Sequence, residues 1–252
     1  MMKIDLNCDL GESFGHYSIG NDEEIMNYVS SVNIACGFHA GDPEIMEKTV
    51  KLAIKKGVSI GAHPGYPDLQ GFGRRPITMS HQALRSMMIY QIGALKAFVE
   101  TYGGKLVHVK PHGALYNLAS KDYDVALTLA KAIYDVDKNL VFMGLAGSEM
   151  IRAGEEVGIK VCRETFADRR YTEELKLVPR GTEGAVIEKI EDSVNQCLHM
   201  IKENKIITID GKEKIMSGDS ICIHGDNKHG LEVVKSLLDS FKDNNIEVGA
   251  VK

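Results

Sequence analysis

The chain has 252 residues, with 30 lysines and arginines against 35 aspartates and glutamates, and its formal net charge is −5. This weak negative charge argues against binding nucleic acid or an anionic membrane through bulk electrostatics. No apolar run reaches the roughly 18 residues of a membrane span, and the first residues do not resemble a signal peptide. The five cysteines form no CxxC pair, which favours a reducing, cytoplasmic compartment over a disulfide framework.

Short apolar segments alternate with longer amphipathic ones along the chain. The short ones are bounded by Gly, Pro or polar residues, as is typical of buried parallel strands. They comprise residues 3–8, 32–36, 58–62, 105–109, 140–144, 159–164 and 219–223. Helical periodicity fills the gaps and predicts helices over residues 23–30, 43–56, 80–103, 148–157, 182–204 and 228–244, with a further helix capped by Ser120. Residues 206–216 predict a small β-hairpin outside the main sheet, on a type I′ turn at Asp210 and Gly211.

Seven strand-then-helix units predict a parallel sheet with right-handed crossovers, in one domain over residues 1–252. An open doubly wound sheet and a closed barrel are the alternatives. No G-x-G-x-x-G follows the first strand and no P-loop motif occurs, so the usual reasons for an open sheet are missing. Polar residues follow most of the strands, which suits a barrel whose whole rim lines one pocket. The sequence therefore favours a seven-stranded parallel (β/α)7 barrel of the TIM type, with the hairpin as an excursion before the last strand.

Four predicted strands end at a histidine flanked by Gly or Pro, namely His39, His63, His112 and His224. One such histidine is more often a hydrogen-bonded turn residue than a ligand. Four at the same end of a barrel predict a functional pocket.

Two carboxylates follow the first strand, Asp9 and Glu12. A carboxylate at this place serves as a general base or binds a cation, although it can also simply cap a turn. Asp9 together with His39 and His63 would form a metal site of two histidines and one carboxylate.

Several cationic side chains are predicted near the same rim. Lys110 has the same parity as His112, and a lysine there can polarise a carbonyl or hold a phosphate or carboxylate. Arg74 and Arg75 lie on a long Gly- and Pro-rich loop over residues 64–79, which predicts a lid or substrate clamp, the alternative being a solvated face. Arg180 precedes the helix predicted from residue 182 and could hold an anion at its N-terminus.

The remaining candidate binding residues also lie near predicted strand ends. They are Asn7, Glu164, Asp168, Arg169 and Asp226, and Asn117, eight residues after the strand predicted over residues 105–109, is a further candidate. From the residues alone, the chain is predicted to be a small-molecule enzyme whose pocket takes an anionic ligand.

Seven ordered motifs of this sequence resemble the LamB/YcsF family, without departure from the family pattern. They are residues 5–12, 33–43, 61–68, 71–75, 109–117, 164–171 and 223–226. The resemblance implies a barrel of the glycoside hydrolase/deacetylase kind. It also implies a hydrolase of cyclic amides, which opens the lactam of 5-oxoproline to glutamate with hydrolysis of ATP to ADP and phosphate. The implied partners are subunits B and C of a 5-oxoprolinase.

Under this resemblance, Lys110 with Arg74 or Arg75 would hold a phosphoryl group or the substrate carboxylate. Asp9 or Glu12, with His39, His63 or His112, would handle protons or a divalent metal. The missing P-loop fits either a non-standard ATP site or a nucleotide held partly by a partner. The alternatives are a stand-alone metal-dependent carbohydrate deacetylase or amidohydrolase, and a regulatory subunit with a vestigial pocket. A homo-oligomer also stays open.

Overall fold

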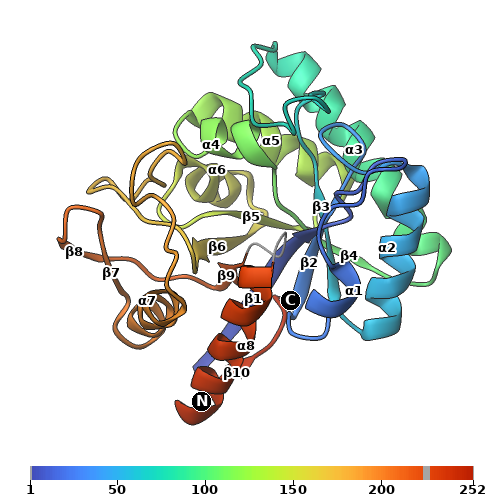
Figure 1. Cartoon of the computed structure of the whole chain (residues 1–252). Coiled ribbons are helices and arrows are strands. Elements are labelled where there is room, and N and C mark those ends of the chain that lie inside the picture. The colour runs from blue at the N-terminus through green and yellow to red at the C-terminus, as the bar shows by residue number, and fades with distance from the viewer. Residues whose placement is uncertain (1, 224–227, 252) are drawn as a thin grey trace.

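Seven parallel strands close into a barrel in the computed structural model, which describes residues 2–223 and 228–251 (Figure 1). The strand order is β1-β2-β3-β4-β5-β6-β9, and β9 pairs back with β1. The strands are β1 Met2–Leu10, β2 Ser31–Ala35, β3 Ser59–His63, β4 Leu106–Val109, β5 Val141–Leu145, β6 Lys160–Phe166 and β9 Ser220–Cys222. The predicted seven-stranded parallel barrel is therefore confirmed.

Helices surround this barrel in the described part of the chain (Figure 1). They are α1 Asp22–Ile25, α2 Pro43–Lys56, α3 His81–Thr101, α4 Gly113–Ala119, α5 Tyr123–Val136, α6 Glu149–Val157, α7 Ile190–Glu203 and α8 Lys228–Asp243. Leu6 and Cys8 of β1 are fully buried in the apolar core, whereas Asn7 and Asp9 alternate with them and belong to a polar network inside the barrel. None of the described helices combines the length and apolar character that a membrane span requires.

Helix α2 has the predicted bounds, residues 43–56, and both of its ends are capped. The Asp42 carboxylate accepts hydrogen bonds from the backbone N–H groups of Glu44 and Ile45, each at 2.9 Å. Gly57 ends the helix with a φ of +69°, a left-handed conformation that glycine adopts without steric cost. These two caps set the bounds of the helix that connects β2 to β3.

The predicted helix cap at Ser120 is wrong. Asp122 caps α5 instead, because its carboxylate accepts from the Val125 N–H at 3.1 Å. The Ser120 hydroxyl donates to the Asn117 carbonyl at the end of the short helix α4, which was not predicted from the sequence.

The helix predicted from residue 182 begins only at Ile190. Gly184 has a φ of +73°, which no right-handed helix contains, and the Ile187 N–H donates to the Asp168 carbonyl. The segment before α7 therefore pairs with the loop after β6 instead of forming the first turns of the helix.

The hairpin before the last barrel strand is confirmed as a separate two-stranded sheet, β7 Lys205–Ile207 and β8 Glu213–Ile215. Its type I′ turn is wrong. The Thr208 N–H donates to the Lys212 carbonyl around a three-residue loop, in which only Gly211 has a positive φ.

A further strand, β10 Ile246–Val248, was not predicted and runs parallel to the first residues of β1. Figure 1 shows β10 and α8 beside this end of β1. Because β1 has nine residues, its first part can pair with β10 while its second part pairs within the barrel.

We predict that Asp42→Ala lowers the free energy of unfolding by about 1 kcal/mol, since it removes the cap of α2. Urea unfolding of the full chain measures this. Glu44→Ala, in the first turn of the same helix, is the control and should change stability by less than about 0.5 kcal/mol. Equal effects of the two substitutions would contradict the capping role.

Candidate active site at the barrel mouth

A hydrogen-bonded polar network fills the inside of the barrel. Asn7 donates to the Ser220 hydroxyl at 2.7 Å, and Asn33 donates to the Asn7 side-chain oxygen at 2.8 Å. Asn33 also lies 2.8 Å from Asp9 Oδ1 and accepts from His108 Nε2 at 2.6 Å. These residues come from four strands, so the network connects the strands across the barrel interior.

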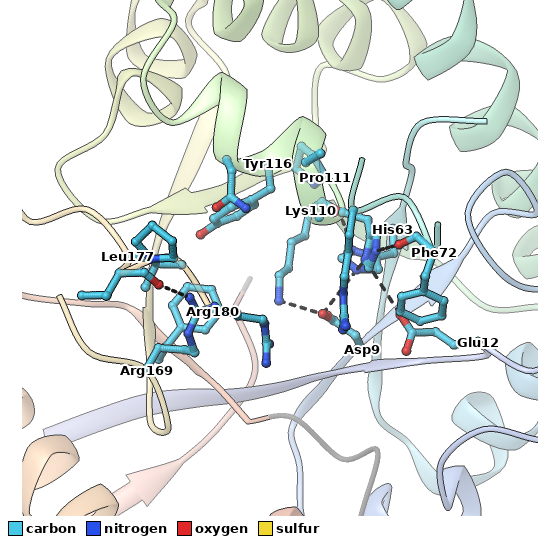
Figure 2. Close-up of a pocket in the computed structure, with 18 of the residues that line it drawn as sticks. Asp9, Glu12, His63, Phe72, Lys110, Pro111, Tyr116, Arg169, Leu177 and Arg180 are labelled. Atoms are coloured by element: carbon cyan, nitrogen blue, oxygen red, sulfur yellow. Dashed lines mark hydrogen bonds and ion pairs between the residues drawn. The ribbon is translucent and has the colours of Figure 1, made fainter. Parts of the chain in front are cut away.

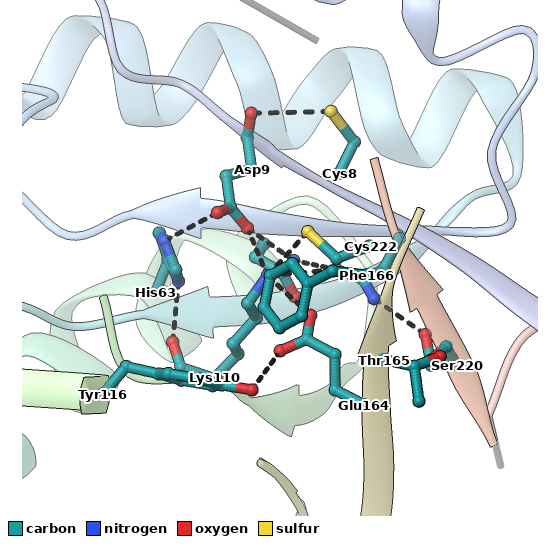
Figure 3. A network of polar contacts seen from close by, with 12 residues as sticks. Cys8, Asp9, His63, Lys110, Tyr116, Glu164, Thr165, Phe166, Ser220 and Cys222 are labelled. Atoms are coloured by element: carbon teal, nitrogen blue, oxygen red, sulfur yellow. Dashed lines mark hydrogen bonds and ion pairs between the residues drawn. The ribbon is translucent and has the colours of Figure 1, made fainter. Parts of the chain in front are cut away.

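Lys110, directly after β4, lies at the centre of this network, with only 2% of its surface exposed (Figure 3). Its ammonium lies 2.9 Å from Asp9 Oδ1 and 2.7 Å from Glu164 Oε1, and it also contacts Cys222 Sγ at 3.2 Å. Burial alone would lower the pKa of Lys110, but the nearby carboxylates outweigh this and raise the pKa well above its ordinary value. Lys110 is therefore a permanent cation between two carboxylates.

Tyr116 of α4 completes the environment of Glu164. The Tyr116 hydroxyl donates to Glu164 Oε2 at 2.6 Å, and both side chains are buried. Burial raises the pKa of Tyr116 well above its ordinary value, and the Glu164 carboxylate raises it further. Tyr116 thus stays a neutral donor that holds Glu164 against Lys110.

A cavity of about 380 Å³ opens above this network at the carboxyl ends of the strands. Asp9, Glu12, His63 and His112 line one wall, which we call the acid–histidine wall. Figure 2 shows Arg169 and Arg180 across the cavity from Asp9 and Glu12. We call Arg169 and Arg180 the cationic wall.

The three rim histidines of the described chain form one buried cluster with Glu12. The rings of His39 and His112 stack with centroids 3.8 Å apart, and His63 meets both edge-on. Each histidine offers one ring nitrogen and Glu12 offers one carboxylate oxygen. These four atoms all lie within 4.8 Å of one another, so this group could hold a metal ion. Asp9, predicted as a ligand with His39 and His63, lies outside this group of four and contacts His63 Nε2 at 3.3 Å.

Burial determines the charge of these rings. It lowers the pKa of His112 to about 3, and the nearby His63 acts in the same direction. Burial also holds the pKa of His39 well below its ordinary value. Both rings are therefore neutral near pH 7 and can offer a nitrogen lone pair.

The loop over residues 64–80 carries Phe72 and Arg74 to the cavity. The Phe72 carbonyl accepts from His112 Nε2 at 2.8 Å, and Phe72 itself has a φ of +53°. A side chain at Gly73 would clash, since its Cβ would lie 2.7 Å from atoms of both His39 and His112. The glycine of this motif is therefore required for the close approach of the loop to the histidines.

The cationic wall contains an unsatisfied donor. Arg169 is 7% exposed and its Nη2 donates to the Val178 carbonyl at 2.6 Å, but its buried Nε has no hydrogen-bond partner among the described residues. Burial, with the neighbouring Arg180, lowers the pKa of Arg169 to about 10, so the guanidinium remains charged at neutral pH. An anionic group in the cavity would satisfy both the charge and the free N–H.

The structure brings most of the predicted site residues together. Those that line the cavity are Asp9, Glu12, His63, Arg74, Lys110, His112, Asn117 and Arg169, and Arg180 joins them. His39, Asn7 and Glu164 lie behind the wall, in contact with lining residues.

Other candidates lie elsewhere. Arg75 is exposed and pairs with Asp68, so the loop turns it away from the cavity. Asp168 is half-buried and is not among the lining residues. Arg180 is not at a helix N-terminus, because α7 begins ten residues later. His224 and Asp226 lie outside the described residues.

Several residues of the site were not predicted from the sequence. Phe72, Tyr116 and Phe166 all lie within the family motifs given above, but aromatic rings gave no reason to place them at a polar pocket. Asn33 and His108 lie within strands, where alternation alone places them on the inner face. Polar residues at inward-facing positions of a buried strand are unusual, and this feature of the sequence could have identified Asn33 and His108 as part of the site.

The fold and the pocket define a β/α-barrel protein with a cavity lined by carboxylates, histidines and arginines where its parallel strands end. The family model of the LamB/YcsF family matches residues 4–252, and the chain belongs to that family. It is 53% identical over 248 residues to a 5-oxoprolinase A subunit from Clostridium beijerinckii, covering 98% of this chain and 97% of that one. It is 48% identical over 251 residues to the Bacillus subtilis protein of that name, covering 100% and 98%. A lactam utilization protein from Thermus thermophilus has the same fold, with a TM-score of 0.94 and 40% identity over 99% of this chain and 100% of that one.

We predict that Tyr116→Phe lowers the free energy of unfolding by about 1.5 to 3 kcal/mol, since it removes a hydrogen bond to a charged, buried partner. Urea unfolding of the full chain measures the loss. Tyr134→Phe, at an exposed tyrosine, is the matched control, for which less than about 0.5 kcal/mol is expected. A change at Tyr116 no larger than the control would show that the hydroxyl does not hold Glu164.

Proposed function

We propose that this chain is the lactam-binding subunit of an ATP-dependent 5-oxoprolinase, in which it works with subunits B and C to convert 5-oxoproline to glutamate. One observation carries the proposal. A single cavity joins an acid–histidine wall to a cationic wall, in a chain that is 53% identical to a protein named as the A subunit of 5-oxoprolinase.

The two walls match the two functional parts of 5-oxoproline. Its carboxylate is an anion. Arg169 and Arg180 offer positive charge, and the buried Nε of Arg169 offers an N–H that has no partner among the described residues. Its cyclic amide then faces Lys110 and the acid–histidine wall. Lys110 can stabilise negative charge on the lactam oxygen, because its ammonium lines the same cavity.

Coupling to ATP follows from amide chemistry. A lactam is a poor electrophile, since its nitrogen lone pair is delocalised into the carbonyl. Attack of the lactam oxygen on the γ-phosphorus of ATP releases ADP and forms a phosphorylated imidate. Water then adds to the ring carbon, the C–N bond breaks, and the ring nitrogen takes a proton. A second water cleaves the resulting acyl phosphate to glutamate and phosphate. The overall reaction therefore consumes two water molecules for each ATP.

Asp9 is the best-placed proton acceptor for the attacking water. Its Oδ1 is held by Lys110 at 2.9 Å and by Asn33 at 2.8 Å. A general base must be held in a fixed position at the cavity wall, and these contacts provide that. The nucleotide would be bound at a non-standard site or partly by a partner protein, as the missing P-loop suggests.

We expect Asp9→Asn to lower turnover about 100-fold or more, because it removes the base without removing the hydrogen bonds around it.

Arg169→Leu should lower kcat/KM about 10- to 100-fold through KM, since it removes a contact to the carboxylate. The measurement is release of ADP and glutamate from 5-oxoproline by the chain co-expressed with subunits B and C.

The matched control is Arg85→Leu, at an exposed arginine that pairs with Asp135 on the helical surface. It should leave turnover unchanged. If Asp9→Asn and Arg169→Leu behave like this control, the cavity is not the site of the lactam chemistry, and a regulatory role with a vestigial pocket takes its place.

A stand-alone metal-dependent amidohydrolase or deacetylase is the second candidate, and the Glu12/His39/His63/His112 group favours it. The two functions differ in their need for ATP. Turnover of an amide substrate by the isolated chain without nucleotide would support the second candidate and exclude the first.

A further inference from the structure

Two neighbouring histidines of the cluster have tautomers that the backbone determines. His63 Nδ1 lies 2.7 Å from the Lys110 carbonyl, and His112 Nε2 lies 2.8 Å from the Phe72 carbonyl. A carbonyl oxygen only accepts hydrogen bonds, so that nitrogen must carry a proton, and in the neutral form of a ring it carries the only one. His63 Nε2 and His112 Nδ1 are then the nitrogens that carry lone pairs.

These two lone-pair nitrogens face each other at 3.0 Å. Asp9 Oδ2 adds a further electron-rich atom 3.3 Å from His63 Nε2, and Glu12 Oε1 lies 3.9 Å from His112 Nδ1. Such an arrangement is repulsive unless a positive centre lies among the atoms. A proton or a metal ion would each supply one.

His39 decides between the proton and the metal ion. It is 1% exposed, and neither of its ring nitrogens has a hydrogen-bond partner within the described ranges. Its Nε2 lies 3.8 Å from Glu12 Oε1, too far for a hydrogen bond. One proton between His63 and His112 leaves His39 unsatisfied, whereas one metal ion can bind His63, His112 and Glu12, and His39 as well once its ring turns out of the stack with His112.

We propose that Glu12, His39, His63 and His112 bind one divalent transition-metal ion of the zinc type. Three imidazole nitrogens and one carboxylate oxygen are the donors that such ions prefer, whereas Mg²⁺ and Ca²⁺ prefer oxygen ligands. The carbonyls of Lys110 and Phe72 orient His63 and His112 by accepting from the ring nitrogen that faces away from the ion, which is typical of metal-bound histidine. The ligand set differs from the predicted Asp9/His39/His63 set, because Asp9 lies outside the group whose ligand atoms are within 4.8 Å of one another, and Lys110 and Asn33 hold its Oδ1.

The test uses the full chain alone, without substrate, nucleotide or partner proteins, so its outcome is independent of the proposed lactam chemistry. The chain is stripped with a chelator and titrated with Co²⁺ while visible ligand-field absorption is recorded. We expect one Co²⁺ per chain, displaced by Zn²⁺ but not by Mg²⁺. Absence of Co²⁺ binding would overturn the proposal and leave a protonated histidine pair as the explanation.

Variants assign the ligands. His39→Gln and Glu12→Gln should each weaken Co²⁺ binding about 100-fold or more, since even changes to the residues that orient metal ligands cost roughly 10- to 100-fold. The matched control is His199→Gln, because His199 also lies near two glutamates, at 3.2 Å from Glu203 and 3.6 Å from Glu213. Loss of binding in the control but not in the two variants would place the ion outside the cluster and overturn the proposal.

Circular dichroism shows whether the variants fold. If they do not, anomalous scattering from crystals of the wild-type chain grown with Co²⁺ decides the matter. A peak among Glu12, His39, His63 and His112 supports the site, and a peak elsewhere or no peak contradicts it.

Discussion

The contact of the Lys110 ammonium with Asp9 and Glu164 is the interaction on which the rest of the site depends. The two carboxylates belong to β1 and β6, and Lys110 follows β4, so one buried cation joins three strands of the barrel. A charge in this place is stable only when paired and hydrogen-bonded. Asn7, Asn33 and Tyr116 supply the remaining hydrogen bonds. The strand ends must therefore converge for the charges to be satisfied, and the same convergence creates the cavity.

The polar interior explains how the site is kept in position. In many barrels of this type the interior is filled by branched aliphatic side chains. Here the apolar residues of β1, such as Leu6 and Cys8, belong to the apolar core, and the inward positions carry amides, hydroxyls and charges. A hydrogen-bonded network of this kind is rigid, since moving one side chain breaks the hydrogen bonds of its buried neighbours. The network therefore restricts the movement of the functional side chains at the barrel mouth.

The barrel could be predicted from the sequence because its signal is local. Each strand is a short apolar run, and ends such as those of α2 carry their own capping residues, Asp42 and Gly57. The errors arose where tertiary pairing overrides local preference. Gly184 and the pairing of Ile187 with Asp168 shorten α7, and Asp122 takes the capping role expected of Ser120.

The site was predictable in part for the same reason. All parallel strands of a barrel end at the same rim, so histidines at the strand ends are predicted to lie at that rim. His39, His63 and His112 are in contact there. Which oxygen approaches which nitrogen depends on a few ångströms of loop geometry, and no spacing rule supplies that. For this reason Glu12 and His112 belong with His39 and His63, while Asp9 is held by Lys110.

Phe72 shows how the loop and the histidines determine each other. A φ of +53° is unfavourable for a residue with a large side chain and costs of the order of 1 to 3 kcal/mol. That conformation persists because the Phe72 carbonyl accepts from His112 and its ring meets His39 and His112 edge-on. The loop is therefore held in this shape by the cluster, and the orientation of His112 is in turn held by the loop. Arg74, two residues further along the loop, lies over the Phe72 ring and lines the cavity, so the contact of the loop with the histidines also positions a cation at the cavity.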